Sequence, residues 1–148
     1  MEVLDHIGMY GVIGVNTYGI FKLWETPTSL SIFVLFIIAN EILNRFLKTT
    51  IRQERPSELI SDKMDSAYYG MPSGHAQHIF FSAMYLQLVK VEYMELIWAI
   101  ALITMYERVA NDKHSFMQVV IGAIIGLGVG YFAHQLTVRY ISFYTISH

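Results

Sequence analysis

The run FMQVVIGAIIGLGVGYFA, residues 116–133, decides the fold of this chain. Gln118 is its only clearly polar side chain, and Ser115 and His134 can extend it at either end. The hydrocarbon core of a bilayer is crossed by a helix of about 20 mostly apolar residues. The run therefore predicts a membrane-spanning helix, because it is too long for the alternative of a glycine-rich strand or loop.

Three glycines in this run recur at every fourth position, as Gly122, Gly126 and Gly130. Residues four apart lie on one face of a helix, and a face of small residues lets a neighbouring helix approach closely in a membrane. The spacing therefore predicts a close helix–helix contact along this face.

The composition of the whole chain agrees with a membrane protein. Its 148 residues suit one domain, with 54% hydrophobic and 15% charged residues, whereas soluble domains carry about 25% charged residues. The net charge of −2 gives no basis for nucleic-acid binding, and the absence of cysteine excludes disulfides and thiolate metal sites. We expect a single integral-membrane, multi-pass domain over residues 1–148.

Further apolar stretches predict an all-α fold, a polytopic transmembrane bundle of five to six helices. The expected helices are 30–47, 77–89 and 93–106, with 8–24 as a less certain one that spans or lies at the interface. Pro27 precedes the helix at 30–47, with Thr28 and Ser29 as candidate caps. The tail 136–148 is too short and mixed to predict a span.

Alternation of the helices across the bilayer brings three polar segments together. The helix at 30–47 enters the long polar loop 48–69, the next helix leaves that loop, and the chain turns back at 90–92 on the far side. Segments 48–55, 72–75 and 108–114 should therefore lie at one membrane surface, where we expect the active site.

The first segment contains Lys48 and Arg55, followed by Pro56. An arginine fork matches two phosphate oxygens, and a lysine supplies a point charge. Taken alone, the segment also fits a basic loop that contacts lipid headgroups.

The second segment is Pro72-Ser73-Gly74-His75, at the start of a predicted helix. Free backbone N–H groups at a helix N-terminus bind anions, and Gly74 lets a phosphate approach the backbone. Ser73 offers a hydroxyl or a helix cap. His75 suits a general acid or base near neutral pH, although a plain turn with an incidental histidine is an equal reading of this segment alone.

The third segment places Arg108 and His114 at the two ends of a short polar turn. Alone, it also fits a loop with ordinary interfacial charges. Together the three segments gather two histidines and three cations at one surface of a bundle with few other charges, and intramembrane ionisable groups are often functional. An imidazole that attacks and cations that stabilise the phosphoryl oxygens make up a phosphoryl-transfer site.

The three segments resemble the type-2 phosphatidic acid phosphatase superfamily, whose pattern is K-x6-RP, PSGH and SR-x5-H-x3-D. Six residues separate Lys48 from Arg55-Pro56, PSGH is intact at 72–75, and Arg108 is followed by five residues and His114. The resemblance implies a metal-independent lipid phosphate or diphosphate phosphatase with no cofactor.

The resemblance also implies a role for each site residue. His114 is the nucleophile that becomes a phosphohistidine, and His75 protonates the leaving oxygen and then activates water. The phosphate would be bound by a set of five residues: Lys48, Arg55, Ser73, Gly74 and Arg108.

Two positions depart from the family pattern. Glu107 stands where the serine is usual, which removes a hydroxyl and adds a carboxylate. Gln118 replaces the aspartate that orients the nucleophilic histidine. At i+4 it shares a face with His114, so its carbonyl oxygen can accept the imidazole N–H, with Asp112 as a less favoured substitute. A neutral amide stabilises a charged imidazole less than a carboxylate does, which predicts slower turnover.

The phrase GMPSGHAQ at 70–77, together with Gln118, is similar to the dolichyl-diphosphate phosphatase branch and suggests a polyprenyl diphosphate substrate. Phosphatidic acid or phosphatidylglycerol phosphate is the alternative substrate. A catalytically decayed lipid-phosphate-binding or scaffold protein is the alternative of another class, and a phosphotransferase on the same site is a third.

Three residues near the segments are not assigned to the reaction. Glu41 is expected to pair with Arg45 at i+4, because an unpaired carboxylate in an apolar helix is unfavourable. His78 lies three positions after His75, and we interpret it as a packed or interfacial histidine.

Overall fold

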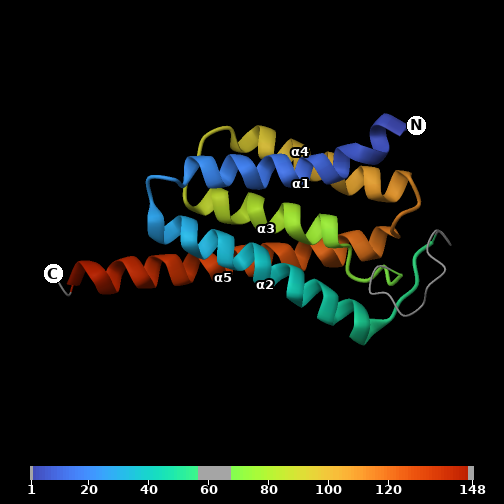
Figure 1. The fold of residues 1–148 in the computed structure, drawn as a ribbon. Coiled ribbons are helices and arrows are strands. Elements are labelled where there is room, and N and C mark those ends of the chain that lie inside the picture. Colours follow the sequence, from blue (N-terminus) through green and yellow to red (C-terminus); the bar gives the residue numbers. More distant parts are fainter. Residues whose placement is uncertain (1, 57–67, 147–148) are drawn as a thin grey trace.

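The computed structural model describes residues 2–56 and 68–146 of the chain (Figure 1). Over these residues the fold is all-helical, and an isolated bridge between Glu54 and Tyr69 is its only extended pairing. The five helices are α1 (Glu2–Lys22), α2 (Pro27–Ile51), α3 (Gly74–Leu88), α4 (Met94–Ala110) and α5 (Phe116–Ile146).

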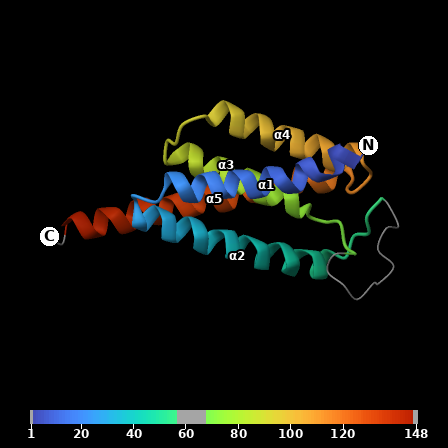
Figure 2. The same cartoon turned by 45° about the horizontal axis from the view of Figure 1, so that its top comes forward.

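Helix α3 occupies the centre of the bundle and contacts the other four helices. α1 and α4 lie side by side on one side of α3, and α2 and α5 pack together on the other (Figures 1 and 2). The end of α2, the start of α3 and the junction of α4 with α5 all lie at one end of the bundle, as helix alternation predicts.

An aromatic cluster forms the centre of the core. The Phe33 ring of α2 stacks on Phe81 and Tyr85 of α3, with ring centroids 5.6 and 5.3 Å apart. The Tyr85 hydroxyl donates to the carbonyl of Ser29 at 2.8 Å and lies 2.9 Å from the Thr137 hydroxyl. Because a buried hydroxyl without partners is destabilising, these bonds permit a tyrosine at the contact of α2, α3 and α5.

The predicted glycine face of α5 packs against α3. A Cβ on Gly122 or Gly130 would lie 2.6 Å from the carbonyl oxygen of Ser73 or Phe81, and one on Gly126 would collide with the carbonyl of Gln77. The prediction of a close helix contact along this face is therefore confirmed. The contact fixes the axial position of α3 against α5, and with it the position of the segment 72–75.

Most helix boundaries differ from the sequence prediction: α1 begins at Glu2 instead of residue 8, α2 ends at Ile51 instead of residue 47, and α4 ends at Ala110 instead of residue 106. Lys48 therefore lies within α2 and not in the predicted loop. α5 continues past residue 133 to Ile146, since neither glycine nor proline follows Gly130 to end it. α2 begins at Pro27 with Thr26 at the N-cap position, so Thr28 and Ser29 are not caps. Proline favours the first helical position because its missing N–H would have no partner there.

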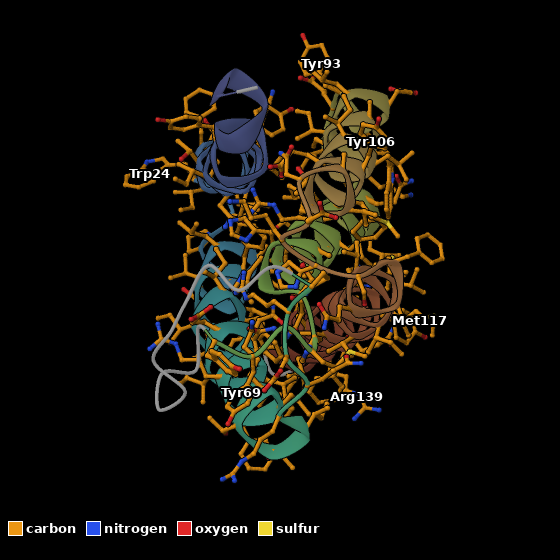
Figure 3. All side chains as sticks on the ribbon, turned by 90° about the vertical axis from the view of Figure 1, so that its right-hand side faces the viewer. Trp24, Tyr69, Tyr93, Tyr106, Met117 and Arg139 are labelled. Carbon is orange, nitrogen blue, oxygen red and sulfur yellow. The ribbon has the colours of Figure 1, made fainter. Side chains whose placement is uncertain are left out.

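Within the part of the chain that the structure describes, two helices are long and apolar enough to cross a membrane, over Pro27–Ile51 and Phe116–Phe143. Only 17% and 39% of the residues in their most apolar windows are buried within the protein, unlike the core helix of a soluble domain. Trp24, Tyr106 and Met117 likewise point away from the bundle (Figure 3) and are more than half exposed. This apolar exterior fits contact with lipid rather than water.

Candidate active site

A cavity of about 670 Å³ is lined by residues of α1, α2 and α3 and by residues of all three polar segments. Five of the predicted site residues line it: Lys48, Arg55, Gly74, His75 and His114. The remaining three, Ser73, Arg108 and Gln118, are buried. The expectation that segments far apart in sequence meet at one end of the bundle is therefore confirmed.

His114 precedes α5 and contacts Gln118 in its first turn. The distance from His114 Nδ1 to Gln118 Oε1 is 3.2 Å. An amide oxygen only accepts hydrogen bonds, so Nδ1 carries the proton and Nε2 carries the lone pair. Asp112, the less favoured substitute for Gln118, is exposed in the preceding turn.

Gln118 also connects α5 to the two loops in front of it. Its Nε2 donates to the carbonyl oxygen of Glu54 at 2.8 Å and lies 3.3 Å from Gln53 Oε1. Its backbone carbonyl accepts from the Ser73 N–H at 3.0 Å, and a Cβ on Gly70 would collide with its side chain. One glutamine thus joins all three segments, a role that its position at i+4 alone does not reveal.

Two cationic side chains from the first segment face the cavity. Lys48 is buried, and its Nζ donates to the carbonyl oxygen of Tyr69 at 2.7 Å. Arg55 Nε is buried without a hydrogen-bond partner among the described residues. Burial lowers the pKa of Arg55, and the nearby positive charge of Arg108 lowers it further. An excess of positive charge around a cavity favours an anionic ligand.

Ser73 stands at the N-cap position of α3, but its side chain makes no capping bond. Its Oγ is fully buried and has no partner among the residues described. Buried polar atoms in native proteins nearly always have a partner, so an orphan calls for an explanation. The orphan atoms of Ser73 and Arg55 belong to two of the three segments, and a bound phosphate would supply the missing acceptor.

Glu107 pairs with Arg108 in a two-pronged contact. Arg108 Nε and Nη2 lie 2.6 and 2.7 Å from the two carboxylate oxygens of Glu107. Glu107 also accepts from Asn111 Nδ2 at 2.9 Å, and only 1% of the residue is exposed. The carboxylate at the departure from the family serine therefore holds the guanidinium of Arg108 in one orientation.

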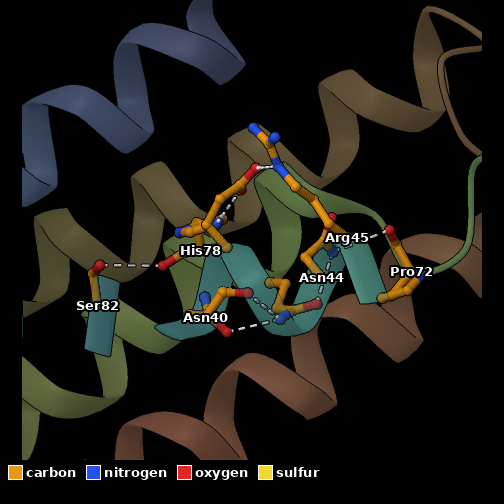
Figure 4. Close-up of polar contacts among 8 residues, drawn as sticks. Asn40, Asn44, Arg45, Pro72, His78 and Ser82 are labelled. Atoms are coloured by element: carbon orange, nitrogen blue, oxygen red, sulfur yellow. Dashed lines mark hydrogen bonds and ion pairs between the residues drawn. The ribbon is translucent and has the colours of Figure 1, made fainter. Parts of the chain in front are cut away.

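A buried amide network behind the cavity joins α2 to the start of α3 (Figure 4). Asn44 Nδ2 donates to Gln77 Oε1 at 2.8 Å and lies 3.3 Å from the carbonyl oxygen of Pro72. Gln77 Nε2 in turn donates to Asn40 Oδ1 at 2.7 Å. The three amides, Asn40, Asn44 and Gln77, are not among the predicted site residues. Polar residues at i and i+4 in an apolar helix, here Asn40 and Asn44, were the available signal.

Glu41 contacts Arg45 and His78 on the cavity wall (Figure 4). Arg45 Nε lies 2.6 Å from Glu41 Oε1, which confirms the predicted i+4 pair. His78 Nε2 lies 3.0 Å from the other carboxylate oxygen. His78 is therefore a largely buried histidine, as the sequence analysis expects, and it is also held by a carboxylate in the same cavity as His75.

The electrostatics of the site keep His114 neutral. Burial lowers the pKa of His114 to about 3, and the charges of Arg55 and Lys48 contribute to the shift. A neutral imidazole with its proton on Nδ1 has a nucleophilic Nε2. The arrangement thus combines a nucleophile, a second histidine in the same cavity and several cations, which suits attack on a phosphorus atom.

Comparison with known proteins agrees with this chemistry. A model of the PAP2 superfamily matches residues 29–142. Lipid phosphate phosphatase gamma of Arabidopsis thaliana is 33% identical over 112 residues, which are 66% of this chain and 49% of the relative. Dolichyldiphosphatase 1 of Dictyostelium discoideum is 30% identical over 132 residues, 80% of this chain and 56% of the relative. The chain thus spans about half the length of these curated relatives. No solved structure matches it significantly.

Proposed function

Because the chain belongs to the PAP2 superfamily, we propose that it is a multi-pass membrane phosphatase that removes phosphate from a lipid phosphate or diphosphate through a phosphohistidine. The observation that carries this proposal is the orientation of His114, whose Nδ1 proton is held by Gln118 in a cavity shared with Lys48 and Arg55. A histidine whose outer nitrogen is oriented toward a cationic cavity has the geometry of a nucleophile for phosphoryl transfer.

The first step forms the covalent intermediate. His114 Nε2 attacks the terminal phosphorus, the N–P bond forms, and the bond from phosphorus to the lipid-side oxygen breaks. The leaving oxygen takes a proton from His75, which the negative charge of the bound substrate keeps in its imidazolium form. Without that charge, burial and the neighbouring cations lower the pKa of His75 to about 4. Lys48, Arg55 and Arg108 balance the charge on the phosphoryl oxygens, and the Ser73 hydroxyl donates to one of them.

The second step releases inorganic phosphate. His75, now neutral, takes a proton from a water molecule as that water attacks the phosphorus. The N–P bond breaks, and Nε2 of His114 regains its lone pair. Gln118 keeps the proton on Nδ1 throughout, so the same tautomer is ready for the next cycle.

The apolar wall of the cavity suits the hydrocarbon part of such a substrate. Beyond the polar end, the lining is made of aliphatic side chains from α1 and α2: Val12, Ile13, Ile37, Ile38 and Ile42. Much of α2 is exposed on the outside of the bundle. A lipid can therefore enter between these helices with its phosphate toward His114 and its chain toward the bilayer.

Within this class we favour a polyprenyl diphosphate as substrate. Gln118 and the phrase GMPSGHAQ at 70–77 support this choice, and one of the relatives is named a dolichyldiphosphatase. Other relatives are named lipid phosphate phosphatases, so phosphatidic acid and phosphatidylglycerol phosphate remain the alternative substrates.

The test is phosphate release by the detergent-purified protein in the presence of EDTA. The panel contains a prenyl diphosphate, the matching prenyl monophosphate, phosphatidic acid and phosphatidylglycerol phosphate, with His114→Ala as the control. Release that resists EDTA and is lost in His114→Ala supports the proposal, and the preferred lipid identifies the substrate. Release from none of the four would favour a decayed, lipid-phosphate-binding protein.

A further inference from the structure

Arg45 and His78 lie one helical turn inward from the phosphate site. Arg45 is three residues before Lys48 on α2, and His78 is three residues after His75 on α3. Residues three apart share a helix face. Because α2 ends and α3 begins at the site, both residues are displaced in the same direction, away from the loops. Both still line the same cavity as His114.

Glu41 brings these two donors together across the gap between the helices (Figure 4). Arg45 Nε lies 2.6 Å from one carboxylate oxygen, and His78 Nε2 lies 3.0 Å from the other. Two donors from different helices thus converge on the two oxygens of one oxyanion. An ion pair within α2 alone would not account for the histidine of α3.

The order of groups along the cavity matches the order of groups in a lipid diphosphate. Lys48 and Arg55 act electrostatically on His114. By their positions along α2 and α3, Arg45, His78 and the carboxylate of Glu41 lie one turn further in, and isoleucines of α2 follow. A terminal phosphate, a second phosphate and a hydrocarbon chain would meet these three zones in turn. One turn of helix advances about 5.4 Å along the helix axis. The long side chains of Lys48 and Arg45 can bend to shorten or lengthen the distance between the two groups that bind phosphate.

We propose that Arg45, supported by His78 and positioned by Glu41, is a second phosphate subsite that binds the lipid-proximal phosphate of a diphosphate substrate. This inference rests on the proposed function and names a specificity determinant within it. A permanently charged guanidinium offsets the desolvation of the second phosphate as it enters the cavity. A lipid monophosphate has no group at this position, so its binding does not depend on Arg45.

The test compares the binding of two non-hydrolysable lipids that share one prenyl chain, a methylenediphosphonate and a phosphonate. Arg45→Gln should weaken diphosphonate binding about tenfold, the loss expected for one charge-assisted hydrogen bond, and should change phosphonate binding less than about twofold. Arg45→Lys keeps the charge but not the fork, so it should fall between wild type and Arg45→Gln.

Arg52→Gln is the matched control. Arg52 follows α2 and does not line the cavity, and its Nε bonds to the carbonyl oxygen of Thr49 at 2.9 Å. This variant loses the same charge near the same end of the bundle, and both ligands should bind it as they bind wild type. Retained phosphonate binding by Arg45→Gln also shows that the variant is folded.

Three outcomes would overturn the subsite: Arg45→Gln leaves diphosphonate binding unchanged, it weakens both ligands equally, or wild type binds the phosphonate as tightly as the diphosphonate. These outcomes are independent of catalysis, because they are measured as dissociation constants. Absence of phosphate release by wild type would count against the proposed function alone.

Discussion

Gln118 Oε1 accepts a hydrogen bond from Nδ1 of His114, over a distance of 3.2 Å. The amide cannot be turned around, because the same oxygen accepts from the Ser115 N–H at 3.1 Å and Nε2 donates to the carbonyl oxygen of Glu54 at 2.8 Å. The glutamine therefore orients His114 as a carboxylate would, but it carries no negative charge. It also holds the loop that carries Arg55 against α5.

Replacing Gln118 with leucine should reduce kcat by about 10- to 100-fold. This is the loss typical in metal sites when the residue that orients a metal-binding histidine is removed, and Gln118 orients His114 in the same way. The imidazole would lose its fixed tautomer, and the carbonyl oxygen of Glu54 would lose a donor. The measurement is steady-state phosphate release from a prenyl diphosphate. Gln135→Leu, the same change near the other end of α5, is the control and should keep wild-type kcat. If Gln118→Leu and Gln135→Leu have the same kcat, Gln118 has no role in the reaction.

His114→Ala should abolish turnover, since it removes the atom that attacks phosphorus. Wild type quenched with alkali after mixing with 32P-labelled substrate should carry acid-labile label, as a phosphohistidine does. The label should be absent from His114→Ala. His78→Ala should keep most of its activity toward a prenyl monophosphate. Wild-type turnover in His114→Ala would refute the assignment of the nucleophile.

His75→Ala should impair monophosphate hydrolysis more than diphosphate hydrolysis. The proposed acid protonates an alcohol oxygen when a lipid monophosphate reacts, and an alcohol is a far poorer leaving group than a phosphate. The measurement is the ratio of kcat values for the two prenyl substrates. An equal loss on both would mean that His75 does not protonate the leaving oxygen.

The pKa of His114 should rise when Arg55 is replaced by glutamine. Burial, together with the charges of Arg55 and Lys48, lowers this pKa to about 3, so the imidazole of wild type is neutral above that pH. Losing one positive neighbour favours the protonated form, and titration then occurs at higher pH. NMR titration of the histidine rings checks this, with Arg139→Gln as a distant control. An unshifted titration, or a wild-type value near 6.5, would contradict it.

Gly126→Ala should destabilise the protein by about 1–3 kcal/mol, the usual range for an overpacked contact. The added methyl group would collide with the backbone carbonyl of Gln77, which cannot move aside as a flexible side chain would. Gly128→Ala is the matched control, since nothing lies within 4 Å of its Cβ position. Thermal unfolding in detergent should show a lower Tm for Gly126→Ala and an unchanged or higher Tm for Gly128→Ala.

Much of this site was predictable because it depends on local patterns. Residues 116–133 predict a helix and its glycine face by their length and four-residue spacing, and Glu41 and Arg45 are a pair by their separation alone. Alternation of apolar helices also brings Lys48, His75 and His114 to one end of the bundle. Each of these inferences needs only the geometry of a single helix or the direction of successive helices.

Other features depend on contacts between segments that no local pattern encodes. Ser73 is of a residue type that commonly caps helices, yet its hydroxyl makes no capping bond. His78 reads as an ordinary packed or interfacial histidine, yet it meets Glu41 from another helix. In each case the partner, or its absence, is set by how loops and helices pack.

The sequence by itself thus determined the helices, the face on which α5 meets α3, and the set of residues that gather at one end of the bundle. Only the tertiary structure decided which atoms from separate segments meet there: Nε2 of Gln118 with the carbonyl oxygen of Glu54, and His78 of α3 with Glu41 of α2. The physical reason is range. Helix periodicity acts over a few neighbouring residues, whereas a hydrogen bond requires two groups within about 3 Å, and for residues far apart in the chain the packing of the whole bundle sets that distance.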